Sequence, residues 1–168
     1  MLEIKLLYSL TPNILNGDLI YRKSEYSLDF IPNADSGIIY LDRKNFCSLS
    51  INTLQLEVDI EKRKILYPWG YFPLVNYVYR KINKPQSVYG NIYINSNEGL
   101  QHGVSYDISN PKSWKLFKDI DNGWVCISKN EDINDIKNNI CIEFAKNSIL
   151  CIKNNTANSL FMKPLLKE

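Results

Sequence analysis

The sequence predicts an all-β fold, mainly an antiparallel sandwich or a partly open barrel, with one or two short helices. Between residues 54 and 60, aliphatic side chains alternate with polar ones, which is the period of a strand with one buried face. Short apolar runs separated by turn residues recur along the chain, as in sandwiches and barrels. No helical period is longer than two turns. We expect one domain, residues 1–168, long enough to bury its own core.

The fold is centred on two strands that we expect to pair. Residues 54–60 form the first strand, and the charged residues 61–64 form the turn after it. A second strand at 65–67 would return antiparallel to the first. We expect Pro68 to stop this strand or to demote it, because proline has no N–H group to donate to a sheet. The bulky aromatic residues of 69–73 follow directly.

The N-terminal residues before this pair give a weaker pattern. Residues 1–17 are ambiguous, and they close with an Asn-Gly pair that is typical of a turn. The loop-forming residues 32–37 interrupt the apolar runs that follow. We therefore expect short strands at 19–21, 26–31 and 38–41.

After the central pair, apolar or alternating runs predict more antiparallel strands. They are expected at 77–79, 88–94, 104–108, 123–127, 140–145, 148–152 and 160–162, with a loop at 154–158. Two segments have helical character instead. Asn110 and Pro111 are typical of a helix N-terminus, and Trp114 and Phe117 would share one face of a helix over 112–118. A second short helix is expected at 132–137.

Composition argues against several classes of function. The net charge is +2 at neutral pH, so no strong overall field attracts nucleic acid or an anionic membrane. We expect neither a signal peptide nor a membrane-spanning stretch, which favours a cytoplasmic protein. The cysteines lack CxxC spacing and are expected to be buried reduced thiols. They are Cys47, Cys126, Cys141 and Cys151.

The single histidine gives catalysis little to build on. His102 lies in a glycine-containing turn, whereas zinc sites commonly use several imidazoles, and no G-x-S-x-G nucleophile motif is present. We expect no catalytic residue, no metal and no cofactor. An enzyme that depends on His102 is the weakest of the alternatives.

One stretch combines cationic and aromatic side chains as single-strand nucleic-acid binders do. Between residues 62 and 84, lysine and arginine are interleaved with tyrosine, tryptophan and phenylalanine. Cations neutralise phosphates, and aromatic faces stack on exposed bases. A β-barrel that binds single-stranded nucleic acid through residues 62–84 is therefore the alternative function. It is the weaker one because the net charge lacks the usual electrostatic footprint.

A second stretch is acidic. Residues 119–135 hold five carboxylates against one lysine, Lys129, and so carry a local net charge of −4. Such a cluster could meet a basic partner and speed its encounter with the chain. The alternative is that Glu131, Asp132 and Asp135 only stabilise the start of a short helix.

Six segments carry a resemblance to a known group of proteins. They are Leu56–Ile60, Leu66–Pro73, Gly99–Ser105, Gly123–Ile127, Glu143–Ala145 and Phe161–Pro164, within residues 54–164. In these segments the chain resembles small bacterial immunity proteins of contact-dependent or polymorphic toxin systems. The resemblance implies an inhibitor that binds the C-terminal domain of one cognate toxin, often a nuclease, and covers its active site. It transfers no functional residue position by position.

We therefore expect an immunity protein, not an enzyme, whose partner-binding residues are acidic and aromatic. Tyrosine is favoured at interfaces because it offers a large contact area for little entropy. The expected partner-binding residues are Asp119, Asp121, Glu131, Asp132, Asp135, Tyr71, Phe72 and Tyr77. The oligomeric state stays open.

Overall fold

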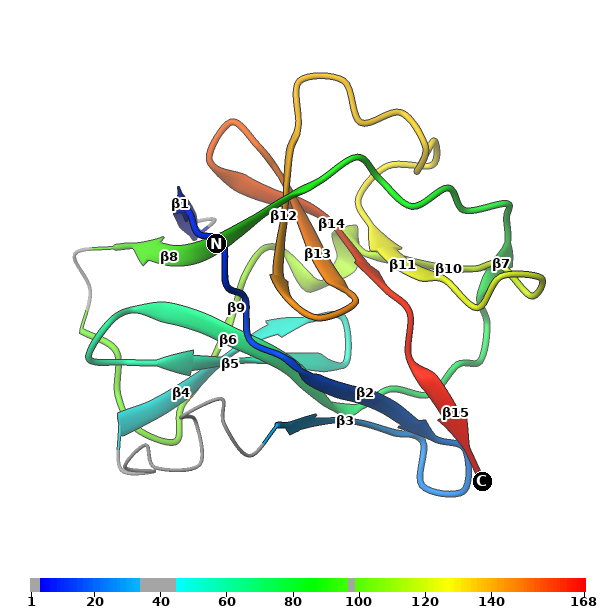
Figure 1. The fold of residues 1–168 in the computed structure, drawn as a ribbon, viewed down its shortest axis with the longest axis horizontal. Helices are drawn as coiled ribbons and strands as arrows, with labels where there is room; N and C mark the ends of the chain where they lie inside the picture. Colours follow the sequence, from blue (N-terminus) through cyan, green and yellow to red (C-terminus); the bar gives the residue numbers. More distant parts are fainter. Residues whose placement is uncertain (1–3, 34–44, 97–98) are drawn as a thin grey trace.

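Strands make up nearly the whole fold of the computed structural model, which describes residues 4–33, 45–96 and 99–168 (Figure 1). The predicted all-β class is confirmed, because the described residues form one curled, open sheet and contain no α-helix. No helical segment among them is long and apolar enough to cross a membrane. The described strands are β1 (Lys5–Leu10), β2 (Gly17–Arg22), β3 (Ser27–Pro32), β4 (Phe46–Ile51), β5 (Leu54–Asp59), β6 (Lys64–Tyr71), β7 (Val78–Tyr79), β8 (Val88–Asn95), β9 (Ser105–Asp107), β10 (Lys115–Lys118), β11 (Val125–Ser128), β12 (Ile140–Ala145), β13 (Ser148–Lys153), β14 (Thr156–Met162) and β15 (Leu165–Lys167).

The central hairpin β5–β6 joins the other strands into one sheet. β5 and β6 pair antiparallel as predicted, from Gln55 opposite Trp69 to Asp59 opposite Lys64. On one side β4 and β9 follow β5, and on the other β6 contacts both β3 and β8. From β8 the sheet continues through β12, β13, β14, β11 and β10 to the edge strand β7.

Asparagine closes several of the hairpins. Asn52 between β4 and β5, Asn147 between β12 and β13, and the Asn154-Asn155 pair between β13 and β14 have φ values from 52° to 62°. Asparagine tolerates this left-handed conformation, and two-residue turns of this kind match the twist of paired strands. The expected loop at 154–158 is therefore only a turn, and β14 begins at Thr156.

The strands enclose a main core and a smaller second one. The main core contains the inward residues of β5, such as Leu54, Leu56 and Val58, all fully buried. The second core lies on the opposite face of the C-terminal strands, where Ile82 and Ile133 cover it. Strands β12 and β13 are consequently buried on both faces, which explains their continuous apolar sequences.

The helix predicted at 112–118 is wrong. Asn110 does cap a turn, since its side chain accepts a hydrogen bond from the Lys112 N–H, but only the 3₁₀ turn η3 (Pro111–Ser113) forms. The chain then becomes β10, in which Leu116 packs in the main core and the adjacent Phe117 in the second. Adjacent residues point to opposite faces in a strand, so both can be buried there. Because both are apolar, the sequence shows no alternation that would have predicted this strand.

Two further predictions are wrong for local reasons. Residues 132–137 form turns and no helix, although Ile133 does face inward. Strand β6 does not stop at Pro68 but runs on to Tyr71. Pro68 lies opposite Leu56 where the β5–β6 register shifts, and a bulge is a place where a sheet tolerates a residue without an N–H group.

Besides β10, three strands lie outside the predicted ones. β1, β4 and β15 were not assigned from the sequence, although buried and half-buried residues alternate along the whole of β4. The strand expected at 38–41 lies outside the described residues. Strand β15 pairs parallel with β2, so its partner is at the other end of the chain.

The cysteines also differ from expectation. Cys141 and Cys151 lie opposite each other on β12 and β13 and are joined by a disulfide, so the prediction of reduced thiols is wrong for this pair. Cys47 and Cys126 are free and buried. Burial, with the Glu57 charge as a smaller cause, raises the pKa of the Cys47 thiol to about 11, and burial also raises the pKa of Cys126. Both stay protonated and unreactive at neutral pH.

Candidate functional site

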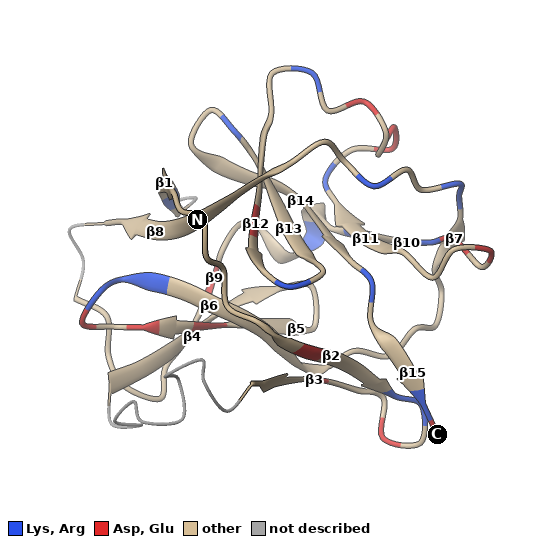
Figure 2. Cartoon of the chain, viewed as in Figure 1, with Lys and Arg blue, Asp and Glu red and all other residues tan. Residues whose placement is uncertain are grey.

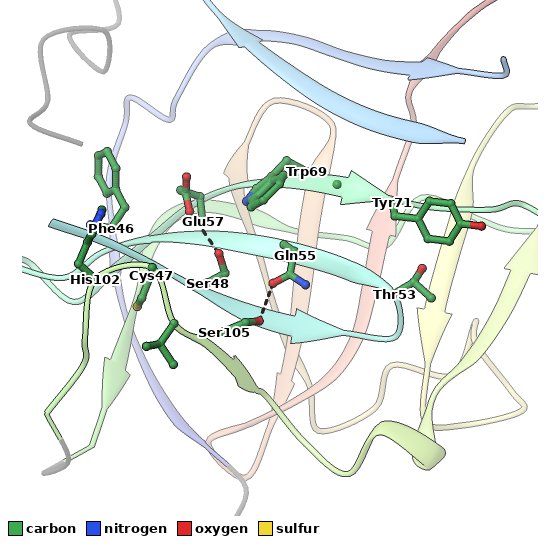
Figure 3. A pocket seen from close by; sticks show the side chains of 13 residues that line it. Phe46, Cys47, Ser48, Thr53, Gln55, Glu57, Trp69, Tyr71, His102 and Ser105 are labelled. Atoms are coloured by element: carbon green, nitrogen blue, oxygen red, sulfur yellow. Dashed lines mark hydrogen bonds between the residues drawn. The ribbon is translucent and has the colours of Figure 1, made fainter. Parts of the chain in front are cut away.

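The outward face of the central hairpin carries a groove with a volume of about 560 Å³, which we call the sheet groove (Figure 3). Strands β4, β5, β6 and β9 supply most of its lining, and the β4–β5 turn and the turn before β9 supply the rest. The lining residues are Phe46, Cys47, Ser48, Thr53, Gln55, Glu57, Trp69, Gly70, Tyr71, His102, Gly103, Val104 and Ser105. The groove is thus built on the central hairpin and on the β4–β9 branch beside it.

Two exposed aromatic residues form the apolar part of the groove. Trp69 is 37% exposed and Tyr71 is 57% exposed, and both come from the end of β6. Trp69 lies beside Gln55 in the β5–β6 register. Large aromatic side chains with this much accessible surface, supported by a rigid strand, are suited to anchor a partner.

A hydrogen-bonded row forms the polar part of the groove. The Ser105 hydroxyl donates to Oε1 of Gln55 at 2.8 Å and lies 2.7 Å from the Ser50 hydroxyl. The Ser48 hydroxyl donates to a carboxylate oxygen of Glu57 at 3.4 Å. Because its oxygen is held in this way, Gln55 directs its NH₂ group toward the Thr53 and Tyr71 end of the groove (Figure 3).

His102 has a structural contact at the rim of the groove. Its Nδ1 atom accepts a hydrogen bond from the Phe46 N–H at 3.3 Å, which ties the turn before β9 to the start of β4. This contact needs an unprotonated Nδ1. No other His, Cys, Asp or Glu group in the described part of the chain joins it to make a set of three that could hold a metal.

The predicted aromatic anchors are divided among three places. Tyr71 lines the sheet groove. Phe72 is 1% exposed and packs edge-on against Tyr21 in the main core, so it cannot contact a partner and that assignment is wrong. Tyr77 is half-buried beside the edge strand β7, where its hydroxyl donates to Tyr79 and Lys118 lies over its ring.

Asp119 is the clearest case of a predicted site residue with a structural role. It is 5% exposed, and its carboxylate accepts from the N–H groups of Ile82 at 2.9 Å, Asp121 at 2.9 Å and Asn122 at 3.3 Å. These hydrogen bonds, with that from Ile82 contributing most, hold the pKa of Asp119 below its ordinary value. The carboxylate fastens the β10–β11 turn to the segment after β7.

Basic residues from other parts of the chain offset the acidic stretch. Glu131 forms ion pairs with Lys115 and, at 3.7 Å, with Arg80, and the Lys115 contact is the main cause that lowers its pKa. Figure 2 shows positive and negative residues intermixed around β7, β10 and β11. Asp121, Asp132 and Asp135 are exposed at this end of the molecule. The charge of −4 counted along the chain therefore does not become an acidic face.

The basic stretch 62–84 is also divided. Its first cations lie at the turn between β5 and β6, and its last lie in the connection from β7 to β8, at opposite ends of the molecule in Figure 2. Arg80 is engaged with Glu131 and lies over the Phe117 ring, and Lys84 is 3.8 Å from Glu143. The described lining of the sheet groove contains no lysine or arginine.

Sequence reasoning missed most of the sheet groove. The alternation of β5 marks Gln55 and Glu57 as outward residues, and that signal was available. The contribution of Ser105 could not be predicted, because β9 pairs parallel with β4 although the two strands are more than fifty residues apart in the sequence. No protein-family model matches the sequence, and a search of curated proteins finds none that matches it.

Proposed function

We propose that the chain is an immunity-type binding protein that neutralises a partner toxin domain by covering its active site, with the sheet groove as the centre of contact. The exposed pair Trp69 and Tyr71 beside the polar row of Gln55 and Glu57 is the observation that carries this proposal. Protein interfaces are typically anchored by a few aromatic residues that become fully desolvated.

The polar row gives the groove the means to select its partner. The Gln55 amide and the Glu57 carboxylate are planar groups with fixed hydrogen-bond directions, and serine hydroxyls hold both. Fixed polar groups discriminate among partners because a buried group without a matching contact costs free energy. A partner that places a polar backbone or side chain against this row, and apolar surface against Trp69, would satisfy both parts.

The groove is the core of an interface and not the whole of it. Stable complexes typically bury about 800 Å² on each partner. The groove would therefore need a surrounding rim, formed by neighbouring parts of β3, β4 and β9. The exposed acids lie in other connections, Asp121 between β10 and β11 and Asp132 and Asp135 between β11 and β12, and none of them lines the groove. We assign them a long-range effect on association rate at most.

Binding of single-stranded nucleic acid is the weaker candidate. Aromatic stacking alone is sequence-tolerant, but such sites combine it with cations that follow the phosphate backbone. The described lining of the sheet groove, to which Trp69 and Tyr71 belong, supplies none. The exposed aromatic pair therefore favours a protein partner over a nucleic acid.

The test begins with capture of the tagged protein from the cells that produce it, with nuclease in the lysate. We expect one stoichiometric protein partner, inhibited while it is bound. Changing Trp69→Ala and Tyr71→Ala together should weaken that complex at least about thirty-fold, since loss of a central anchor typically costs about 2 kcal/mol or more. Titration calorimetry measures the change.

Tyr79→Ala is the matched control. Tyr79 is 64% exposed but lies on β7, away from the groove, so its loss should leave affinity unchanged. Equal affinities for the parent chain and the Trp69/Tyr71 variant would refute the groove as the contact surface. A partner that disappears with nuclease treatment would refute the inhibitor itself.

A further inference from the structure

Strand β1 is an edge strand with an unusual amount of exposed apolar surface. It pairs antiparallel with β8 along its whole length, from Lys5 opposite Asn95 to Leu10 opposite Gly90. Among the described strands only β8 pairs with it, and on its other side the β13–β14 turn and the segment after β9 reach only its first residues. Leu7, Tyr8 and Leu10 are 48%, 46% and 67% exposed. Edge strands of this kind are templates for pairing with another strand.

The backbone of β1 shows which groups are available for such pairing. The N–H groups of Ile4 and Leu6 point away from β8, since they donate to Ile108 and Asn155. Because backbone direction alternates along a strand, the backbone N–H and C=O groups of Tyr8 and Leu10 also point away from β8. In the described part of the chain, neither Tyr8 nor Leu10 has a hydrogen-bond partner on that side.

Neighbouring residues of β8 extend the apolar surface. Val88 and Tyr89 are 42% and 51% exposed, and the Thr11 N–H donates to the Tyr89 carbonyl, which places the end of β1 beside them. Across β1 and β8 the only charged side chain is Lys5. This patch shares no residue with the sheet groove.

We propose that β1 pairs antiparallel with β1 of a second copy, with Ser9 on the two-fold axis. In that register Tyr8 of each copy lies opposite Leu10 of the other, so the outward polar groups of both residues are satisfied. If the axis lay at Tyr8 instead, Leu10 of one copy would pair with Leu6 of the other, whose N–H already donates to Asn155. If the axis lay at Leu10, Tyr8 would pair with Pro12, which has no N–H group to donate.

The side chains are compatible with this two-fold axis. Each Tyr8 packs against a Leu10, an aromatic and aliphatic cross-strand pair of the favourable kind. A two-fold axis places like residues near each other, so an uncharged centre is required. Lys5 satisfies that requirement because it lies four residues from the axis.

The surface area predicts how strong this dimer is. The five exposed apolar residues of β1 and β8 amount to on the order of 400 Å² per copy with ordinary side-chain areas. A standard stable interface buries about twice that on each partner. We therefore expect a dimer that forms reversibly, in the micromolar range or weaker, and not an obligate one.

Sedimentation velocity at concentrations up to the millimolar range tests the dimer, and a Ser9→Cys variant tests its register. Residues at a non-hydrogen-bonded antiparallel pair are close enough for a disulfide, so Ser9→Cys should form a covalent dimer under mild oxidation. The free native cysteines, Cys47 and Cys126, are buried and add no background. Ser24→Cys, exposed in the β2–β3 turn, is the matched control and should stay monomeric.

Leu10→Pro separates self-pairing from folding. It removes an N–H group that points away from β8, so the β1–β8 pairing is kept while the dimer should be lost. Ile120→Lys, which adds a charge at another exposed apolar residue, should leave the dimer intact. A monomer at every concentration, or a dimer in which Ser9→Cys does not cross-link, would overturn the proposal.

Discussion

At the scale of single residues, Asp119 shows how a carboxylate can hold two distant segments of the chain together. One of its oxygens accepts from Ile82 and the other from Asp121 and Asn122. The sequence reveals a charged residue at this position but not what surrounds it. The same is true of Glu131, whose charge is balanced by Lys115 from another strand. Local charge counts therefore mislead wherever a sheet brings together residues that are distant in the chain.

Asp119→Asn should destabilise the fold in a pH-dependent manner. The amide has only one oxygen, so one side of the bridge is lost and a donor is placed against a donor. The folded-state pKa of Asp119 lies below its ordinary value of 3.8. Its contribution to stability is thus fully present above that value and is lost as pH falls through the folded pKa. Urea unfolding should show the largest difference from the parent at neutral pH and a shrinking one below 3.8.

Asp121→Asn provides the comparison for this series. Asp121 is exposed, and it contributes its backbone N–H, not its carboxylate, to the same turn. Its substitution should change the free energy of unfolding little at any pH. Equal pH profiles for the two variants would contradict the structural role of Asp119.

At the scale of elements, most strands with one buried face could be predicted from their alternation. Most strands with two buried faces could be placed only approximately. β5 and its pairing with β6 were predicted because Leu54, Leu56 and Val58 alternate with polar residues. β10 was taken for a helix because its adjacent residues Leu116 and Phe117 belong to different cores. A second core could not be predicted from the sequence, because it depends on the segments around Ile82 and Ile133, which cover it from outside the strands.

The β12–β13 hairpin carries the second element-scale result, its disulfide. Replacing Cys141 and Cys151 by alanine should lower the free energy of unfolding by about 2–3 kcal/mol, from the loop-closure entropy for a separation of 10 residues. Denaturant unfolding measures the loss, and reductant should affect the parent chain in the same way. If alkylation of the unfolded, unreduced chain labels all four cysteines, the pair is not bonded.

The redox state of this pair in cells also reports the compartment. A cytoplasmic protein was expected, yet the cytoplasm keeps thiols reduced, and disulfides persist mainly in oxidising compartments. Alkylating the thiols at the moment of lysis distinguishes an oxidised from a reduced Cys141–Cys151 pair. An oxidised pair would place the chain in an oxidising compartment, and a reduced pair would agree with the cytoplasm.

At the scale of the whole molecule, the sheet separates three surfaces with different chemistry. The sheet groove is aromatic and polar, the end around β7, β10 and β11 has mixed charge, and the β1–β8 edge is apolar. The sequence predicted Tyr71 as a contact residue, but it could not show which aromatic residues lie outside the core. Phe72 and Tyr71 are adjacent in sequence and have opposite environments, because neighbouring residues of an extended chain point to opposite faces of a sheet. The register shift between Ile65 and Pro68 changes which of the two faces the core.

The measurement that tests the central claim most directly is fluorescence quenching by acrylamide in the presence of the captured partner. Of the three tryptophans, Trp114 and Trp124 are buried at 8% and 6% exposure, so Trp69 supplies most of the quenchable signal. A partner that covers the sheet groove should strongly reduce quenching, and a Trp69→Phe variant should show little quenching with or without it. Unchanged quenching of the parent chain in a saturated complex would contradict the claim that the groove binds the partner.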